Sequence, residues 1–326
     1  MPTSVTSSSS DSITVIGPTV FDLSGRTQIE LQGVDRSKFL HGFCTNEIKS
    51  LQPGQGCEAF LTNIKGRVLG HVFVFADTES LWLDTVPGQE TALIAHLDRY
   101  VIREDVQLVG RSSSHGELFI TGTHAAALLM LDDGLPPYGS TSRTDLEHPL
   151  QIRRVDLLGM PGFQISLPRD AVDSTRSRLV AVGCRAGTDD EFETRRIEAG
   201  FPYFGVDFTE DQIAQEVART SRCISFTKGC YLGQEPIARL DAMGHTNREL
   251  RRIRFQPGVV PQRGAKLLAA ESDDEAGEIT SVAPLPNARG ETTCLGYLKT
   301  KFGRPDTAVR IATNEQRAMG TVLEVV

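Results

Sequence analysis

Short runs of apolar residues, broken by polar turns, make up most of the first two thirds of this chain of 326 residues. Residues 68–75 alternate and then run apolar, and residues 81–83 resume the pattern after a polar turn, which predicts a β-hairpin. Residues 89–100 carry apolar side chains on one helical stripe, which predicts an amphipathic helix. Paired strands and a single helix recur at residues 106–109, 117–120 and 124–131, and at residues 152–157, 163–167 and 171–182. This order indicates α+β subdomains.

The pattern changes after Gly244 to short strands separated by Gly- and Pro-containing turns. These predicted strands lie at residues 250–255, 265–268, 279–282, 293–297, 309–312 and 319–325. Their number and spacing are typical of a small β-barrel or sandwich. The first residues are rich in Ser and Thr and lack an apolar run. We therefore predict a disordered tail at 1–12, an α+β domain at 13–245 and a β domain at 246–326.

Composition narrows the possible functions. The chain has 34 basic and 42 acidic residues and a formal net charge of -8, which argues against generic nucleic-acid binding. No run approaches the ~18 apolar residues of a membrane span, and no arginine of a transit peptide precedes Arg26, so we expect a cytoplasmic protein. The six cysteines form no C-x-x-C pair, so we expect neither a disulfide scaffold nor a resident metal.

Cys230 is the first candidate for chemistry. It stands between two glycines in Lys228-Gly229-Cys230-Tyr231-Leu232-Gly233-Gln234-Glu235, and Pro236 suits the first position of a helix that we predict to end at Gly244. A nearby helix N-terminus and the cation of Lys228 both favour the thiolate. The alternative is a small buried side chain, because free cysteines usually lie in the core. We interpret Cys230 as a reactive thiol.

Glu198 is the second candidate. Thr188 and Glu191 form a capping box, and Gly200 suits the residue after a helix end, so Glu198 falls in the last helical turn. A carboxylate is unfavourable there because it faces the negative end of the helix dipole. It either forms ion pairs with Arg195 or Arg196, or accepts hydrogen bonds from a ligand.

Four segments carry a family resemblance. The octapeptide at residues 228–235 resembles the K-G-C-[FY]-x-G-Q-E signature of the YgfZ-type folate-binding proteins, which are related to the aminomethyltransferase of the glycine cleavage system. Residues 33–48 and 60–67 are similar to the family's G-x-D-x-x-x-F-L-x-G, T-N-[DE]-I and F-L-T-x-x-K-G-R elements. Residues 196–200 resemble the R-[IL]-E-A-G segment shared with aminomethyltransferases. With Gly277–Ser281 and Leu295–Tyr297, these matches span nearly the whole chain.

This resemblance implies a ring of folate-binding α+β subdomains followed by a small C-terminal β-barrel, with tetrahydrofolate as the ligand. It implies that Glu198 binds the pterin and that Cys230, with Lys228, serves iron-sulfur client or assembly proteins. Further candidate contacts for the folate are Lys65, Arg67, Asp207, Tyr231, Gln234 and Arg239. Basic residues at a hairpin entry, such as Lys65 and Arg67, are more often simply solvated. The alternative for Arg239 is an ion pair with Glu235 one helical turn away, and Asp207 also suits a turn.

One departure from the family pattern concerns catalysis. Where aminomethyltransferases have a carboxylate that steers the folate amine, this chain has Leu69 and Gly70, which perform no acid–base chemistry. His71, the next residue, is interpreted as a structural histidine. We therefore predict a folate-binding accessory protein that supports iron-sulfur cluster assembly or repair. The alternatives are a folate-dependent one-carbon transferase and a folate-sensing module in which Cys230 is inert.

Overall fold

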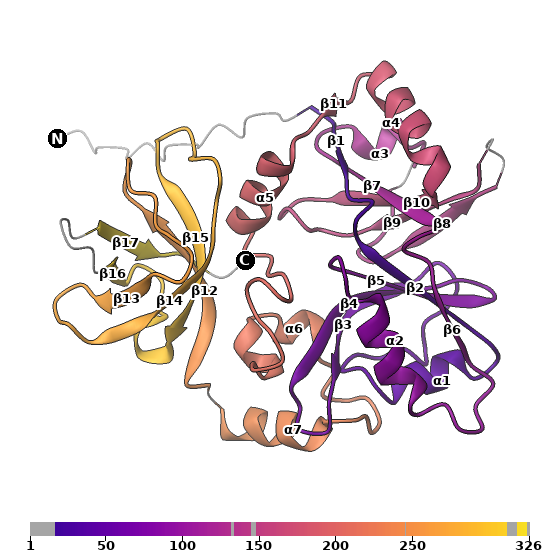
Figure 1. Cartoon of the computed structure of the whole chain (residues 1–326), viewed down its shortest axis with the longest axis horizontal. Coiled ribbons are helices and arrows are strands. Elements are labelled where there is room, and N and C mark those ends of the chain that lie inside the picture. The colour runs from indigo at the N-terminus through magenta and orange to yellow at the C-terminus, as the bar shows by residue number, and fades with distance from the viewer. Residues whose placement is uncertain (1–16, 132–133, 145–147, 245, 312–317, 325–326) are drawn as a thin grey trace, which may run out of the picture.

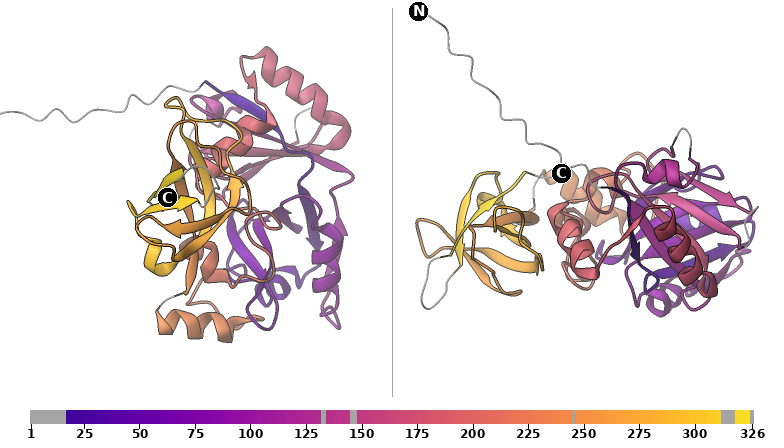
Figure 2. Two further views of the ribbon diagram at one scale, coloured as in Figure 1. Left: turned by 60° about the vertical axis from the view of Figure 1, so that its left-hand side comes forward. Right: turned by 90° about the horizontal axis from the view of Figure 1, so that it is seen from above.

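Two β-sheets and a β-barrel are joined by a segment of short helices and loops (Figure 1). The computed structural model describes residues 17–131, 134–144, 148–244, 246–311 and 318–324. The view from above places the barrel at one end of the molecule, the two sheets at the other, and the helical segment between them (Figure 2). The tail predicted at residues 1–12 lies outside the described residues.

The first sheet has the strand order β3-β4-β5-β2-β6. Its strands are β2 (Thr27–Gln32), β3 (Gly56–Thr62), β4 (Val68–Ala76), β5 (Ser80–Thr85) and β6 (Gln107–Gly110), and its helices are α1 (Arg36–His41) and α2 (Glu90–Asp98). Strands β4 and β5 pair antiparallel from Phe73 opposite Asp84 to Ala76 opposite Leu81, which confirms the predicted hairpin. Leu93 and Leu97 of α2 are buried in the core of this sheet, as the helical stripe predicted.

The second sheet has the order β11-β1-β7-β10-β9-β8. Its strands are β1 (Thr19–Asp22), β7 (His115–Thr121), β8 (Ser140–Arg143), β9 (Leu150–Arg154), β10 (Gly162–Pro168) and β11 (Arg185–Ala186). Helices α3 (Ala125–Leu128) and α4 (Val172–Ala181) follow β7 and β10, with the short helix η1 (Arg169–Ala171) before α4. Their apolar side chains, among them Ala125 and Leu179, share one core with this sheet.

Polar side chains join the two sheets. Gln164 of β10 donates a hydrogen bond to Asp84 of β5 at 2.8 Å, and Ser166 donates to Gln28 of β2 at 2.5 Å. Aromatic residues of both sheets fill the rest of this interface, including Phe73 and Phe119. Because buried polar groups need partners, these bonds fix how one sheet lies on the other.

A closed barrel forms the C-terminal part of the described chain, in the order β12-β15-β14-β13-β16-β17. Its strands are β12 (Arg248–Phe255), β13 (Lys266–Ala269), β14 (Glu275–Val282), β15 (Thr292–Lys299), β16 (Ala308–Ile311) and β17 (Ala318–Val322), with η3 (Thr300–Phe302) after β15. The predicted fold class, α+β subdomains followed by a small barrel, is thus confirmed. The division at residues 245 and 246 stays a prediction.

The segment between the sheets and the barrel holds α5 (Asp189–Glu198), η2 (Ala214–Val217), α6 (Thr220–Cys223) and α7 (Gln234–Met243). The capping box of Thr188 and Glu191 is present at the start of α5, as predicted. Helix α7 ends at Gly244 with a φ of 81°, also as predicted. The predicted start of α7 is wrong: the helix begins at Gln234, so Pro236 is its third residue. Proline is tolerated there because the first N–H groups of a helix lack intrahelical partners.

Candidate functional site

Glu198 ends α5 beside the first strand of the barrel. Arg252 of β12 donates a hydrogen bond to its backbone carbonyl at 2.6 Å, which fixes the end of the helix. The carboxylate is half-buried and has no hydrogen-bond partner in the described part of the chain. Burial raises its pKa above the usual value, against the lowering effect of Arg254, Arg195 and Arg252. An acceptor in this position is available to a ligand that brings N–H donors.

The neighbouring arginine of α5 is engaged elsewhere. Arg196 is fully buried and pairs with Glu193 and Asp207, the latter at 2.6 Å. A small cavity of about 30 Å³ lies just beyond the end of α5, bordered by Gly200, Arg219 and Arg252, and Glu198 is not among its lining residues.

The loop of Cys230 is held between α1 and the turn that joins β3 to β4. Leu232 donates its N–H to the carbonyl of Gly42 at 2.9 Å and accepts from the hydroxyl of Thr62 at 2.7 Å. Gly233 has a φ of 84°, and a Cβ there would lie 2.3 Å from the carbonyl oxygen of Asn63. Only glycine fits this approach. The loop therefore presents Cys230 to solvent, whereas the other five cysteines are buried.

Lys228 turns inward from the same loop. Its ammonium donates to the backbone carbonyls of His41, Cys44 and Asn46 at 2.7, 2.6 and 2.7 Å. It also lies over the ring of Tyr231, 4.9 Å from the centroid. Burial lowers its pKa. Since an ammonium has three N–H donors, Lys228 uses all of them to fix the loop, and its influence on the Cys230 thiolate stays a prediction.

The remaining candidates lie in the same region, and some of them are exposed while others are buried. Arg239 of α7 is exposed and borders a cavity of about 310 Å³ together with Gly66 and Glu235. Lys65 is exposed beside Gly66, while Arg67 donates to the backbone carbonyl of Asp211. Gln234 begins α7 and Tyr231 is buried. Helix α7, which carries Arg239, and the β3–β4 turn, which carries Gly66, thus form two parts of the wall of this cavity.

Asp207 is buried and serves as a hydrogen-bond acceptor within the chain. It accepts from Arg196 at 2.6 Å, from the hydroxyls of Ser281 and Thr280 at 2.6 and 2.8 Å, and from the N–H of Tyr203 at 2.9 Å. Ser281 and Thr280 belong to β14, so this carboxylate ties the end of α5 to the barrel. Its predicted contact with folate stays untested, and its carboxylate oxygens are already engaged.

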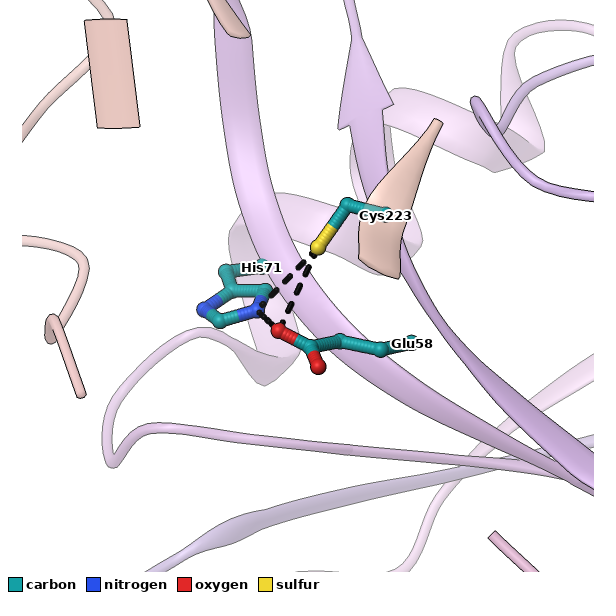
Figure 3. A group of neighbouring side chains, drawn as sticks. All are labelled: Glu58, His71 and Cys223. Carbon is teal, nitrogen blue, oxygen red and sulfur yellow. Dashed lines mark hydrogen bonds and ion pairs between the residues drawn. The ribbon is translucent and has the colours of Figure 1, made fainter. Parts of the chain in front are cut away.

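A buried polar cluster that the sequence analysis missed lies between β3, β4 and α6 (Figure 3). The carboxylate of Glu58 contacts Nε2 of His71 at 2.6 Å and accepts from the thiol of Cys223 at 3.2 Å. Arg219 binds the same carboxylate through two nitrogens, at 2.7 and 2.5 Å. Tyr138 donates a further hydrogen bond at 2.8 Å. Strand alternation, which places His71, Phe73 and Phe75 on one face, is the only sequence signal for it.

Electrostatics keep this cluster in one protonation state. Burial alone raises the pKa of Glu58, but Arg219 and His71 outweigh burial and hold that pKa well below its usual range. Burial lowers the pKa of His71, against the raising effect of Glu58. Burial also raises the pKa of Cys223 well above its usual value. Near neutral pH the cluster is therefore a carboxylate, a neutral imidazole and a thiol.

The same three side chains are of metal-ligating types. Their nearest ligand atoms lie within 4.8 Å of one another. However, both oxygens of Glu58 already accept hydrogen bonds, two of them from the guanidinium of Arg219. A cation would have to displace that guanidinium, and the absence of a resident metal stays a prediction. Within the described residues, no helix is long and apolar enough to cross a bilayer.

Two sheets followed by a closed barrel give this chain an aminomethyltransferase-like fold. Residues 14–228 match the sequence model of the GCVT N-terminal domain, and the chain belongs to that family. The glycine cleavage system aminomethyltransferase T from Bartonella henselae superposes with a TM-score of 0.76 at 20% identity, over 94% of this chain and 85% of that one.

Curated relatives agree with this placement. The aminomethyltransferase of Rippkaea orientalis is 23% identical over 94% of this chain and 85% of its own length. The mitochondrial aminomethyltransferase of Gallus gallus is 23% identical over 91% of this chain and 78% of its own length. A chloroplastic protein of Arabidopsis thaliana that is named as a transferase is 25% identical to this chain, which covers 66% of its length.

Proposed function

We propose that this protein binds tetrahydrofolate and transfers a one-carbon unit, as an aminomethyltransferase-like enzyme. The family match over residues 14–228 is the observation that carries this proposal. The relatives named as aminomethyltransferases match nearly the whole chain, which weighs toward an enzyme and away from an accessory role. Cytoplasmic location stays a prediction, since relatives in chloroplasts and mitochondria are among the matches.

The chemistry of aminomethyl transfer sets a requirement. When an aminomethyl thioether reacts with tetrahydrofolate, the carbon leaves sulfur and nitrogen and becomes a methylene bridge between two folate nitrogens. Each folate nitrogen gives up one proton; one proton converts the departing thiolate to a thiol and the other accompanies the departing ammonia. No electrons are gained or lost, so the site needs a group that passes protons.

His71 is our candidate for that group, although its side chain is buried and borders neither of the cavities described above. Its imidazole is neutral near neutral pH, and its Nε2 is oriented by Glu58, which Arg219 holds ionised. It follows Leu69 and Gly70, where the sequence lacks the carboxylates of aminomethyltransferases. A neutral histidine oriented by a carboxylate is a common proton acceptor.

The test measures ammonia and methylene-tetrahydrofolate formed from tetrahydrofolate and an aminomethylated lipoyl carrier protein. Turnover by the wild type is expected, and His71→Gln is expected to lose it by about 10²-fold or more while still binding tetrahydrofolate. If the wild type binds tetrahydrofolate but releases no ammonia from this donor, the aminomethyl-transfer proposal fails and the accessory role described below is favoured.

Glu198→Ala is expected to weaken tetrahydrofolate binding by about 1.5 to 3 kcal/mol, the range for hydrogen bonds to a charged group. The reason is that its half-buried carboxylate has no hydrogen-bond partner in the described chain and is free to accept from a pterin. Calorimetric titration of the wild type and the variant measures the difference. Glu193→Ala, on the same helix, is the matched control. Equal affinity in a folded Glu198→Ala variant removes Glu198 from the site.

A second candidate function is supported by Cys230. In this role the protein is a YgfZ-type accessory factor, and the thiol serves iron-sulfur client or assembly proteins. The supporting observation is that Cys230 is the one exposed cysteine of the six, on a loop fixed by Lys228 and Gly233. In a folate-sensing module, by contrast, the thiol has no chemical task.

Cys230 is expected to react with iodoacetamide at pH 7 at least about tenfold faster than each other cysteine, because thiol reactivity follows exposure and thiolate content. Burial raises the pKa of Cys44 to about 11 and that of Cys294 to about 12, which leaves both protonated. Site-resolved mass spectrometry across pH 5 to 9, with and without tetrahydrofolate, measures the rates. Labelling of Cys230 no faster than Cys44 contradicts the reactive-thiol interpretation.

A further inference from the structure

A cavity of about 210 Å³ lies on the second sheet, between helices α3 and α4. Its other walls come from β8, β9 and β10, which lie beside these helices in the upper right of Figure 1. None of the residues assigned above to folate or to Cys230 chemistry borders it. It is therefore independent of the proposed function.

Aliphatic side chains form most of the wall of this cavity. Ile152 of β9, Ile165 of β10 and Leu179 of α4 are buried and belong to the core of the second sheet. Met130 and Val182 line the same cavity, yet they are 62% and 60% exposed. Because contact between water and apolar surface is unfavourable, an apolar group that displaced this water would be stabilised.

The backbone at Met130 is unusual for the turn that it occupies. Met130 follows the end of α3 with a φ of 53°, and Met130 and Leu131 donate their N–H groups to the carbonyls of Ala127 and Ala126, both at 3.0 Å. In this Schellman arrangement glycine is favoured, because a residue with a Cβ is strained at positive φ. The turn alone therefore does not require a methionine. Its flexible thioether instead gives the cavity an adaptable apolar wall.

Basic side chains border the same cavity. Arg143 of β8, His148 and Arg178 of α4 are among its lining residues, and no lining residue in the described part of the chain is acidic. Both arginines also interact elsewhere in the chain. A guanidinium has five N–H donors, however, so it can bind a carboxylate in addition to another partner. The charge of the lining residues thus matches an anionic group at the end of an apolar body.

We propose that this cavity binds a medium-chain aliphatic monocarboxylate, a free fatty acid whose chain lies between α3 and α4. Its carboxylate would lie beside Arg143 and Arg178, and its chain would contact the aliphatic wall. An ester of the same acid lacks the anion that guanidinium groups favour. Dry apolar cavities of about 150 Å³ hold benzene, so a volume of about 210 Å³ suits a chain of about eight carbon atoms.

Calorimetric titration of the whole protein with octanoate tests this proposal. Octylamine is the control, because it has the same chain and the opposite charge. We expect saturable binding of octanoate and at least about tenfold weaker binding of octylamine, the ratio that loss of a charge-assisted hydrogen bond gives. Hexanoate should bind about tenfold more weakly than octanoate, because it buries two methylene groups fewer.

A pair of variants on α4 tests whether octanoate occupies this cavity. Thr175 is half-buried and lines the cavity, so Thr175→Phe fills the space without removing a core side chain. This variant should weaken octanoate binding by at least about tenfold. Ser177→Phe is the matched control and should bind octanoate like the wild type. Ser177 is exposed, does not line the cavity, and lies two residues along the helix, on another face.

A second pair of variants tests the place of the carboxylate. Arg178→Glu should weaken octanoate binding by at least about tenfold and strengthen octylamine binding. Arg176→Glu changes the net charge equally from a position that does not line the cavity, and it should leave both affinities unchanged. The proposal is overturned if octanoate gives no saturable heat, if octylamine binds as tightly, or if Thr175→Phe binds octanoate like the wild type. An unchanged preference for octanoate in Arg178→Glu overturns it too.

Discussion

Arg219→Met is expected to lower the free energy of unfolding by about 3 to 5 kcal/mol at pH 7, because it leaves the carboxylate of Glu58 buried without its cation. Arg219 binds both oxygens of that carboxylate, and Glu58 is fully buried. Methionine keeps most of the side-chain volume, so the loss reports the charge. Urea unfolding followed by circular dichroism measures it. Arg222→Met, an exposed neighbour on α6, is the control and should cost under about 1 kcal/mol.

The pH dependence gives this prediction a second signature. In the wild type the pKa of Glu58 is held well below its unfolded value, so its contribution is present above the unfolded pKa and is lost as pH falls toward the folded one. Without Arg219, burial should raise that pKa above the unfolded value. The variant should then recover stability as pH falls through its new, higher pKa. The deficit should therefore shrink between pH 7 and pH 5, and a constant deficit contradicts the proposed cause.

Asp207→Ala is expected to cost about 3 to 5 kcal/mol of unfolding free energy, because it removes one partner of a buried ion pair. The side chains of Asp207 and Arg196 are both fully buried, and the carboxylate also holds Ser281 and Thr280 of the barrel. Thermal unfolding of the wild type and the variant measures the change. A cost below about 1 kcal/mol would show that the buried pair does not stabilise the fold.

Glu193→Gln is the matched comparison for Asp207. Glu193 contacts the same guanidinium of Arg196, but its side chain is 34% exposed. Solvent screens such a pair, so its loss should cost about 1 kcal/mol or less. Combining both substitutions tests whether the two carboxylates act on Arg196 independently. Asp207→Ala also separates a structural role of Asp207 from a role in ligand binding. If this variant loses tetrahydrofolate binding but keeps its stability, Asp207 binds the ligand.

Local patterns were sufficient for much of the fold. The hairpin of β4 and β5, the capping box of α5 and the barrel strands follow from alternation, caps and turns, each encoded within a few residues. The start of α7 was placed too late, because Pro236 was assigned to the first helical position. In the structure it occupies the third, and Gly233, with a φ of 84°, precedes the helix. Both positions lack an intrahelical N–H bond, so the proline does not distinguish them.

The Glu58 cluster could not be predicted from local sequence patterns. Arg219 is separated from Glu58 by 161 positions, and only the packing of α6 against β3 brings them together. His71 alone is an ordinary histidine in an apolar strand, and nothing adjacent in sequence distinguishes it from a structural one. The resemblance of the octapeptide identified Cys230, but it did not reveal that Lys228 is bound by three carbonyls.

Lys228 has a consequence for how a partner reaches Cys230. If the loop moved away from the rest of the protein, the ammonium of Lys228 would lose its three hydrogen bonds to backbone carbonyls at once. Those carbonyl oxygens would also be left without this donor. The loop that carries the Cys230 thiol is therefore held in a fixed position. A protein that reacts with Cys230 must bring its own reactive group to a fixed point, so the rate of that encounter is set by the shape and charge of the partner's surface.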